Sequence, residues 1–109
     1  MLAEHKLAPL RKGLLEFLVL KIVGGRSVYV ADILRRLGGT DFATQEGTLY
    51  PLLSKLRREG LVQYAWQESE LGPPRKYYRL TASGEAQLTE LEHYWARLNH
   101  TISDLGSSP

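Results

Sequence analysis

The sequence predicts a mainly α-helical fold with a small β-hairpin, a winged helix-turn-helix followed by a long C-terminal helix. Residues 44–80 have the order of one helix followed directly by two short strands. The last helix carries apolar residues at alternating steps of three and four. With 109 residues, 43% of them hydrophobic and 24% charged, the chain is expected to form one compact unit. Residues 1–80 are the predicted winged helix-turn-helix, and residues 81–109 are the last helix and a short tail.

Two helices are predicted before this region. The first runs from about Leu7 to Val23 and is apolar on several sides, so we expect it to contact more than one element. Gly24-Gly25 is expected to end it. Ser27 is the predicted N-cap of the second helix. That helix is expected to end at Leu37 and to bury a stripe of apolar side chains, namely Val30, Ile33, Leu34 and Leu37.

Thr44 is the predicted N-cap of the third helix, and Gly60 is expected to close it. Pro51 is unusual inside a helix, so either the helix effectively starts near Gly47 or it opens with a distorted turn. One side of this helix is apolar, with Leu49, Leu52, Leu53 and Leu56. The opposite side is polar and lacks acids, with Gly47, Tyr50, Pro51, Ser54, Lys55 and Arg58.

Alternating residues predict the hairpin that follows, with strands at residues 61–66 and 77–80. Gly72-Pro73-Pro74 is the predicted turn, with Arg75 and Lys76 where the hairpin folds back. Of the strand tyrosines, Tyr77 or Tyr78 is expected to belong to the core. Thr81 is the predicted N-cap of the last helix, and residues 106–109 are expected to fray.

The third helix and the hairpin predict a surface that binds double-stranded DNA, because hydroxyls and cations without acids suit phosphates and base edges. The charge distribution agrees. Residues 1–80 carry 13 Lys or Arg against eight Asp or Glu, whereas residues 81–105 carry one against four. The predicted DNA-binding residues in this region are Thr44, Thr48, Tyr50, Ser54, Lys55, Arg58, Arg75 and Lys76.

The last helix is about 36 Å long, more than a small domain needs to cover itself. Its strict apolar seam predicts a partner helix, so we expect a homodimer formed by this helix with help from the first. The alternative is a helix that lies on its own core. In a dimer, two recognition helices about 34 Å apart would read an inverted repeat. The predicted interface residues are Leu7, Leu10, Leu88, Leu91, Trp95, Leu98, Ile102 and Leu105.

The segments GTLYPLLSKLRREGLV and GPPRKYYRLTASGE resemble signature segments of the PadR family of transcriptional regulators, and the resemblance covers residues 7–105. It implies a dimeric winged-helix DNA-binding protein, often a repressor, whose affinity for DNA responds to a small ligand. It also implies a phosphate contact for Tyr29. The chain departs from the family at this point, since the second helix often begins with glycine-tyrosine-glutamate and here reads Val28-Tyr29-Val30.

Trp95 resembles a tryptophan of multidrug-binding PadR-like regulators that stacks on drugs in a pore between subunits. The resemblance therefore implies a planar hydrophobic ligand. Its binding residues would be Leu14, Leu15, Leu18, Leu91, Trp95, Leu98 and Asn99. The alternative is that Trp95 simply packs the dimer interface.

Other classes of function find less support in the sequence. His5, His93 and His100 are scattered, and no phosphate loop or nucleophile elbow is present, so we expect no enzyme, no metal and no cofactor. The chain has no cysteine, no long apolar run and no signal-peptide pattern, so we expect a cytoplasmic protein outside the membrane. A winged helix used for protein–protein or RNA contact is the remaining alternative.

Overall fold

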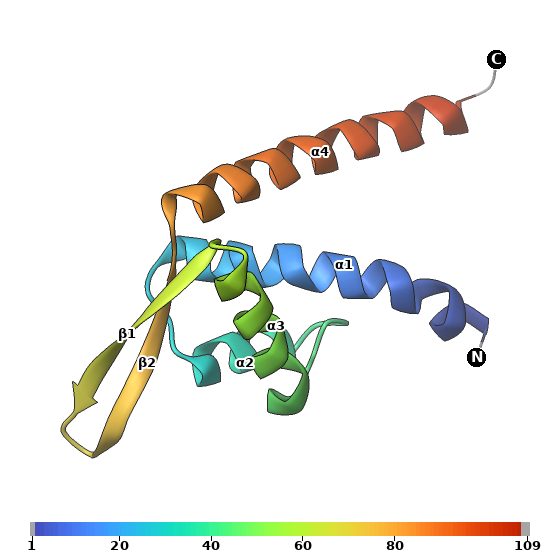
Figure 1. Ribbon diagram of the computed structural model, residues 1–109. Helices are drawn as coiled ribbons and strands as arrows, with labels where there is room; N and C mark the ends of the chain where they lie inside the picture. Colours follow the sequence, from blue (N-terminus) through green and yellow to red (C-terminus); the bar gives the residue numbers. More distant parts are fainter. Residues whose placement is uncertain (1, 108–109) are drawn as a thin grey trace.

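The computed structural model of the protein describes residues 2–107, with side chains from Lys6 onwards. The elements are α1 (Leu2–Gly25), α2 (Val30–Gly38), α3 (Glu46–Arg58), β1 (Val62–Ser69), β2 (Gly72–Leu80) and α4 (Ala82–Gly106). Figure 1 shows α2, α3 and the hairpin on one side of α1, while α4 runs along the other side. The predicted fold class is confirmed, with an antiparallel β1–β2 hairpin, here called the wing, and a long last helix.

The hydrophobic core lies between α1, α2, α3 and the base of the wing. α1 contacts α2, β2 and α4, as its several apolar sides predict. Leu34, Leu52 and Leu88 are half-buried at the edge of the core. The fully buried side chains come from the predicted inner faces and include Val19, Leu20, Val23, Ile33, Leu49, Leu53, Leu56 and Val62.

The prediction of Ser27 as the N-cap of α2 is wrong, because Tyr29 is the N-cap. Val28 is held in an extended conformation by a bridge to Tyr78, in which each backbone N–H donates to the other residue's carbonyl. The helix therefore starts only at Val30. Asp32 completes the start, since its carboxylate accepts a hydrogen bond of 3.2 Å from the Tyr29 backbone N–H.

The start of α3 also differs from the prediction by one residue. Gln45, not Thr44, is the N-cap, and its side chain makes no capping hydrogen bond. Pro51 lies inside the helix without ending it. Gly60 follows the helix with a φ of +77°, a left-handed conformation that glycine adopts without strain. The predicted closure at Gly60 is therefore confirmed.

The predicted turn at Gly72-Pro73-Pro74 is wrong, because these residues begin β2 and the turn lies at Glu70 and Leu71. The pairing is irregular here, since Gln67 opposes Arg75 and Ser69 opposes Gly72. Proline has no N–H to donate, so Pro73 and Pro74 are tolerated at this break in the ladder. The wing is therefore longer than the sequence suggested.

The two long helices extend beyond their predicted limits. α1 begins at Leu2 and includes Gly24 and Gly25, which were expected to end it. In α4, Thr81 is confirmed as the N-cap, with its hydroxyl accepting from the Gly84 N–H at 2.9 Å. Gly106 is the last residue of α4 rather than part of a tail, and residues 108–109 lie outside the described residues. None of the described helices is long and apolar enough to cross a membrane.

Gly84 lets α4 approach the turn between α3 and β1. A Cβ atom added at Gly84 would lie 1.9 Å from the carbonyl oxygen of Leu61. That oxygen also accepts a hydrogen bond of 3.1 Å from the Thr81 N–H, so it is fixed in place. The first turn of α4 can therefore sit against the wing only if residue 84 has no side chain.

Replacing Gly84 with alanine should lower the free energy of unfolding by about 3 kcal/mol, because a backbone carbonyl cannot move aside as a flexible side chain can. Gly13→Ala is the matched control. Gly13 lies in α1, and a Cβ atom added there would meet nothing within 4 Å, so this change should stabilise the protein by about 0.5–1 kcal/mol. Urea denaturation at one protein concentration measures both. Equal stability of the two variants would contradict the close approach at Gly84.

Candidate nucleic-acid interface

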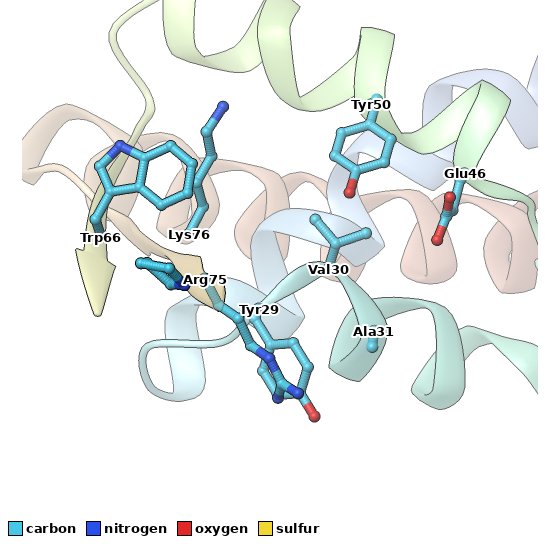
Figure 2. A pocket seen from close by; sticks show the side chains of 9 residues that line it. Tyr29, Val30, Ala31, Glu46, Tyr50, Trp66, Arg75 and Lys76 are labelled. Carbon is cyan, nitrogen blue, oxygen red and sulfur yellow. The ribbon is translucent and has the colours of Figure 1, made fainter. Parts of the chain in front are cut away.

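A groove opens between α2, α3 and the wing, with a volume of about 510 Å³. We call it the wing groove. Figure 2 shows Trp66 and Lys76 on the wing at one side of this groove, with Tyr50 and Glu46 of α3 at the other. Its lining residues are Tyr29, Val30, Ala31, Glu46, Tyr50, Trp66, Pro74, Arg75 and Lys76.

Aromatic rings hold the two wing cations. The Arg75 guanidinium lies 4.9 Å from the ring centre of Tyr29, and Tyr29 in turn contacts Tyr77. The Lys76 ammonium lies 4.5 Å from the Tyr64 ring centre and 5.3 Å from that of Trp66. A cation–π contact orients a cation without neutralising it. Within residues 6–107 neither cation has a carboxylate partner, so both charges remain available to an anion.

Three sides of α3 now have distinct surroundings. The side whose residues are all exposed, here called the outward row, consists of Gly47, Pro51, Ser54 and Arg58. Tyr50 lies beside this row and faces the wing groove (Figure 2). Arg57, on the same flank, lies 5.0 Å from the ring centre of Tyr64. The wing and α3 therefore share one aromatic and cationic surface.

The other flank of α3 faces α1. Two cavities of about 230 and 220 Å³ lie here and share Lys12, Leu15 and Thr48, and together we call them the α1–α3 groove. Thr44 lines the first cavity and Lys55 the second. The Lys55 ammonium donates to a Glu16 carboxylate oxygen at 2.9 Å. This hydrogen bond and the negative charge of Glu16 raise the pKa of Lys55.

The predicted DNA-binding residues thus fall into three groups. Tyr29, Tyr50, Arg75 and Lys76 meet at the wing groove. Ser54 and Arg58 belong to the outward row. Thr44, Thr48 and Lys55 lie at the α1–α3 groove, and Lys55 is engaged by Glu16 rather than free.

Sequence reasoning missed three members of these surfaces. Trp66 was not among the predicted site residues, yet it is 62% exposed at the wing groove. Glu46 places a carboxylate in the same groove, although the polar side of α3 was expected to lack acids. Lys12 lines both cavities of the α1–α3 groove. Only the correct strand register would have shown from the sequence that Trp66 lies opposite Lys76 across the hairpin.

The apolar seam of α4 is only partly used by the protomer itself. Leu88 and Leu91 pack against the core, and Leu98 is half-buried. Further along, Trp95, Ile102 and Leu105 are 40%, 59% and 81% exposed. Leu7 and Leu10 of α1 are exposed as well, and the α1 N-terminus and the α4 C-terminus extend on the same side of the molecule (Figure 1). An ion pair between Lys21 and Glu92 joins the two helices nearer the core.

The residues expected to hold a planar ligand are divided by the structure. Leu91, Trp95, Leu98 and Asn99 follow one another along α4, and Leu14 is half-buried on α1. Leu15 and Leu18 pack against the core, and Leu15 also lines the α1–α3 groove. Leu15 therefore faces α3, and we leave it out of the proposed ligand site.

A helix with one exposed polar side beside a cationic wing is typical of winged helix-turn-helix DNA-binding proteins. Comparison with known proteins agrees, since the model of the PadR-like family of transcriptional regulators matches residues 19–90. The chain therefore belongs to the PadR-like family and is a DNA-binding transcriptional regulator, not an enzyme, as the sequence predicted. No cluster of potential metal ligands occurs among the residues that the structure describes.

Solved structures of related proteins cover nearly the whole chain. A PadR-like transcription factor from Bacteroides fragilis is 42% identical, with a TM-score of 0.80 over 91% of this chain and 96% of that one. A PadR-like regulator from Bacillus cereus is 34% identical, with a TM-score of 0.79 over 90% and 96%. A PadR family regulator from Eggerthella lenta is 30% identical, with a TM-score of 0.83 over 99% and 95%.

Proposed function

We propose that the protein is a homodimeric repressor that binds an inverted-repeat operator through α3 and the wing. The observation that carries this proposal is the pair of unneutralised wing cations, Arg75 and Lys76, beside the exposed recognition helix. A dimer bound at a promoter blocks access to that DNA, which is the simplest route to repression. The fold and the family support the DNA-binding part of the proposal.

On DNA, the outward row of α3 enters the major groove, because all four of its residues are exposed. Thr48, Tyr50 and Ser54 then supply hydroxyls to bases or phosphates, and Arg58 supplies charge at the end of the helix. Arg75 and Lys76 contact the phosphates next to the wing. Tyr29 supports Arg75 through its ring and leaves its own hydroxyl at the start of α2 for a phosphate.

The shape of the protomer supports a dimer. Its radius of gyration is 16.3 Å, whereas about 13 Å is typical of a compact chain of this length. Its accessible surface is 8050 Å², and about 6,100 Å² is typical of a folded monomer of 12.3 kDa. The excess of about 2,000 Å² per protomer matches the area that stable homodimers bury. A second copy, packed on the exposed seam of α4 and on Leu7 and Leu10, would cover the apolar part of this surface.

A ligand site at the same interface forms the last part of the proposal. Trp95 is 40% exposed in the middle of the seam, between half-buried Leu91 and Leu98. A two-fold axis near this position would bring a second Trp95 close, and two facing indoles can accept a flat apolar molecule between them. We propose that such a molecule relieves repression by changing the distance between the two recognition helices.

Replacing Arg75 with alanine should weaken DNA binding about tenfold at physiological salt and lower its dependence on salt. Each dimer loses two phosphate contacts, so the slope of log K against log salt should fall by about 1.8. Fluorescence anisotropy of labelled DNA from upstream of the protein's own gene measures both quantities. Arg97→Ala is the matched control, because Arg97 also lies over a tyrosine ring, that of Tyr94, but on α4. Equal slopes for both variants would contradict the wing contact.

Replacing Ile102 with glutamate should convert the dimer into a folded monomer, because it places two charges in the apolar seam. His100→Glu is the control, since His100 lies on the opposite side of α4 and is exposed. Light scattering coupled to size-exclusion chromatography gives the mass, and circular dichroism checks the fold. A dimer that survives the Ile102 change, or a wild-type monomer, would contradict the seam as the interface.

A planar aromatic dye should quench the fluorescence of Trp95 in the dimer and not in the monomer. The Trp66→Phe variant leaves Trp95 as the single tryptophan and provides the reporter. Adding the Ile102→Glu change to this variant should remove the quenching, because the slot needs both copies. Quenching of equal strength in the monomeric variant would show that the dye binds elsewhere.

A further inference from the structure

We infer that the α1–α3 groove is a second phosphate-binding site, in which Lys12 of α1 holds the DNA strand opposite to the one held by the wing. This inference rests on the proposed DNA-binding function and extends the DNA-binding surface to α1, a helix that the sequence alone does not assign to DNA binding.

The walls of the groove have the chemistry that a phosphate needs. Lys12 is exposed, lines both cavities and has no carboxylate partner among the ion pairs of residues 6–107. Thr44 and Thr48 bring two hydroxyls from the opposite wall, and Arg11 lies at the first cavity. Lysine and threonine are among the side chains that most often contact phosphate oxygens in protein–DNA complexes.

The position of Lys12 on α1 directs it toward α3. Lys12 lies one helical turn before Glu16, and residues four apart share one side of a helix. Glu16 reaches α3, since it pairs with Lys55. The ammonium of Lys12 therefore lies along the same side near Thr48, about two turns nearer the start of α3 than Lys55.

The dimensions of DNA make a two-sided arrangement necessary. The major groove is about 12 Å wide, and a helix with its side chains is about 10–12 Å across. A helix that fills the groove therefore has one phosphate strand on each flank. The outward row separates the two flanks of α3, with the wing cations beyond Tyr50 on one side and Lys12 beyond Thr48 on the other. One set of cations faces each strand.

Glu16 sets the strength of this second site. Its carboxylate engages Lys55 at 2.9 Å, so it both neutralises a cation of the groove and repels a phosphate. Lys12 is the lysine of the α1–α3 groove that has no carboxylate partner within residues 6–107. Replacing Glu16 with glutamine should release the charge of Lys55 into the groove and tighten DNA binding about threefold to tenfold, in the direction opposite to the loss of Lys12.

The test compares Lys12→Ala with Lys21→Ala on DNA that the wild-type dimer selects from a random-sequence library. Both changes remove one lysine from α1, but Lys21 faces α4, where it pairs with Glu92. Lys12→Ala should lower the slope of log K against log salt by about 1.8 per dimer, while Lys21→Ala should leave it unchanged. Circular dichroism and light scattering check that both remain folded dimers.

Ethylation interference then identifies the strand. Lys12→Ala should lose contacts at phosphates across the major groove from those lost in Arg75→Ala. A Lys12→Ala slope equal to that of the wild type, or loss of the same phosphates in both variants, would overturn the α1 site while leaving the wing contact and the proposed function intact. Failure of the wild-type protein to select any DNA would instead overturn the proposed function, and the α1 site with it.

Discussion

Two backbone hydrogen bonds between Val28 and Tyr78 determine where the wing lies relative to the helix-turn-helix. The Val28 N–H donates to the Tyr78 carbonyl at 3.0 Å, the Val28 carbonyl accepts the reciprocal bond at 2.6 Å, and both side chains are buried. Because Val28 is paired in this bridge, α2 starts only at Val30. The ring of Tyr29, between them, lies against the Arg75 guanidinium. The pairing therefore holds the wing beside the start of α2, where the wing groove and its cations lie. Because buried peptide groups cannot exchange such bonds for water without cost, the wing is held as part of the core rather than as a free loop.

Ion pairs engage some of the surface lysines, whereas the wing cations Arg75 and Lys76 have no carboxylate partner within residues 6–107. Lys55 and Lys21 are tied to Glu16 and Glu92, so α1 is joined by ion pairs to α3 on one side and to α4 on the other. Exposed pairs of this kind contribute little to stability, because water screens both charges. Their effect is to neutralise Lys21 and Lys55. The aromatic contacts of Arg75 and Lys76, in contrast, orient these cations and leave their charge unneutralised. Helix α1 therefore carries both Glu16, which pairs with Lys55 of α3, and part of the exposed apolar surface.

Much of the fold could be predicted from the sequence because helical period and strand alternation are local properties. The inner face of α3, the cap at Thr81 and the glycine after α3 all follow from residues within a few positions of one another. The misplaced caps at Ser27 and Thr44 and the misplaced turn at Pro73 have another origin. The start of α2 depends on the bridge from Val28 to Tyr78, 50 residues further along the chain. The hairpin register depends on Pro73 and Pro74, which have no N–H to donate across the ladder. The site was predicted less completely for the same reason. Only the packing of α1 against α3 shows that Lys55 is engaged by Glu16 and that Lys12 shares its groove.

Hydroxyl-radical footprinting on DNA selected by the protein from a random-sequence library would test most directly whether two α3 helices read the operator as a two-fold pair. Each strand should show two protected blocks, related by a two-fold axis and with centres about 10–10.5 base pairs apart, the spacing of successive major grooves. A single protected block, or uniform weak protection without sequence preference, would contradict the dimeric reading of DNA by α3 and the wing.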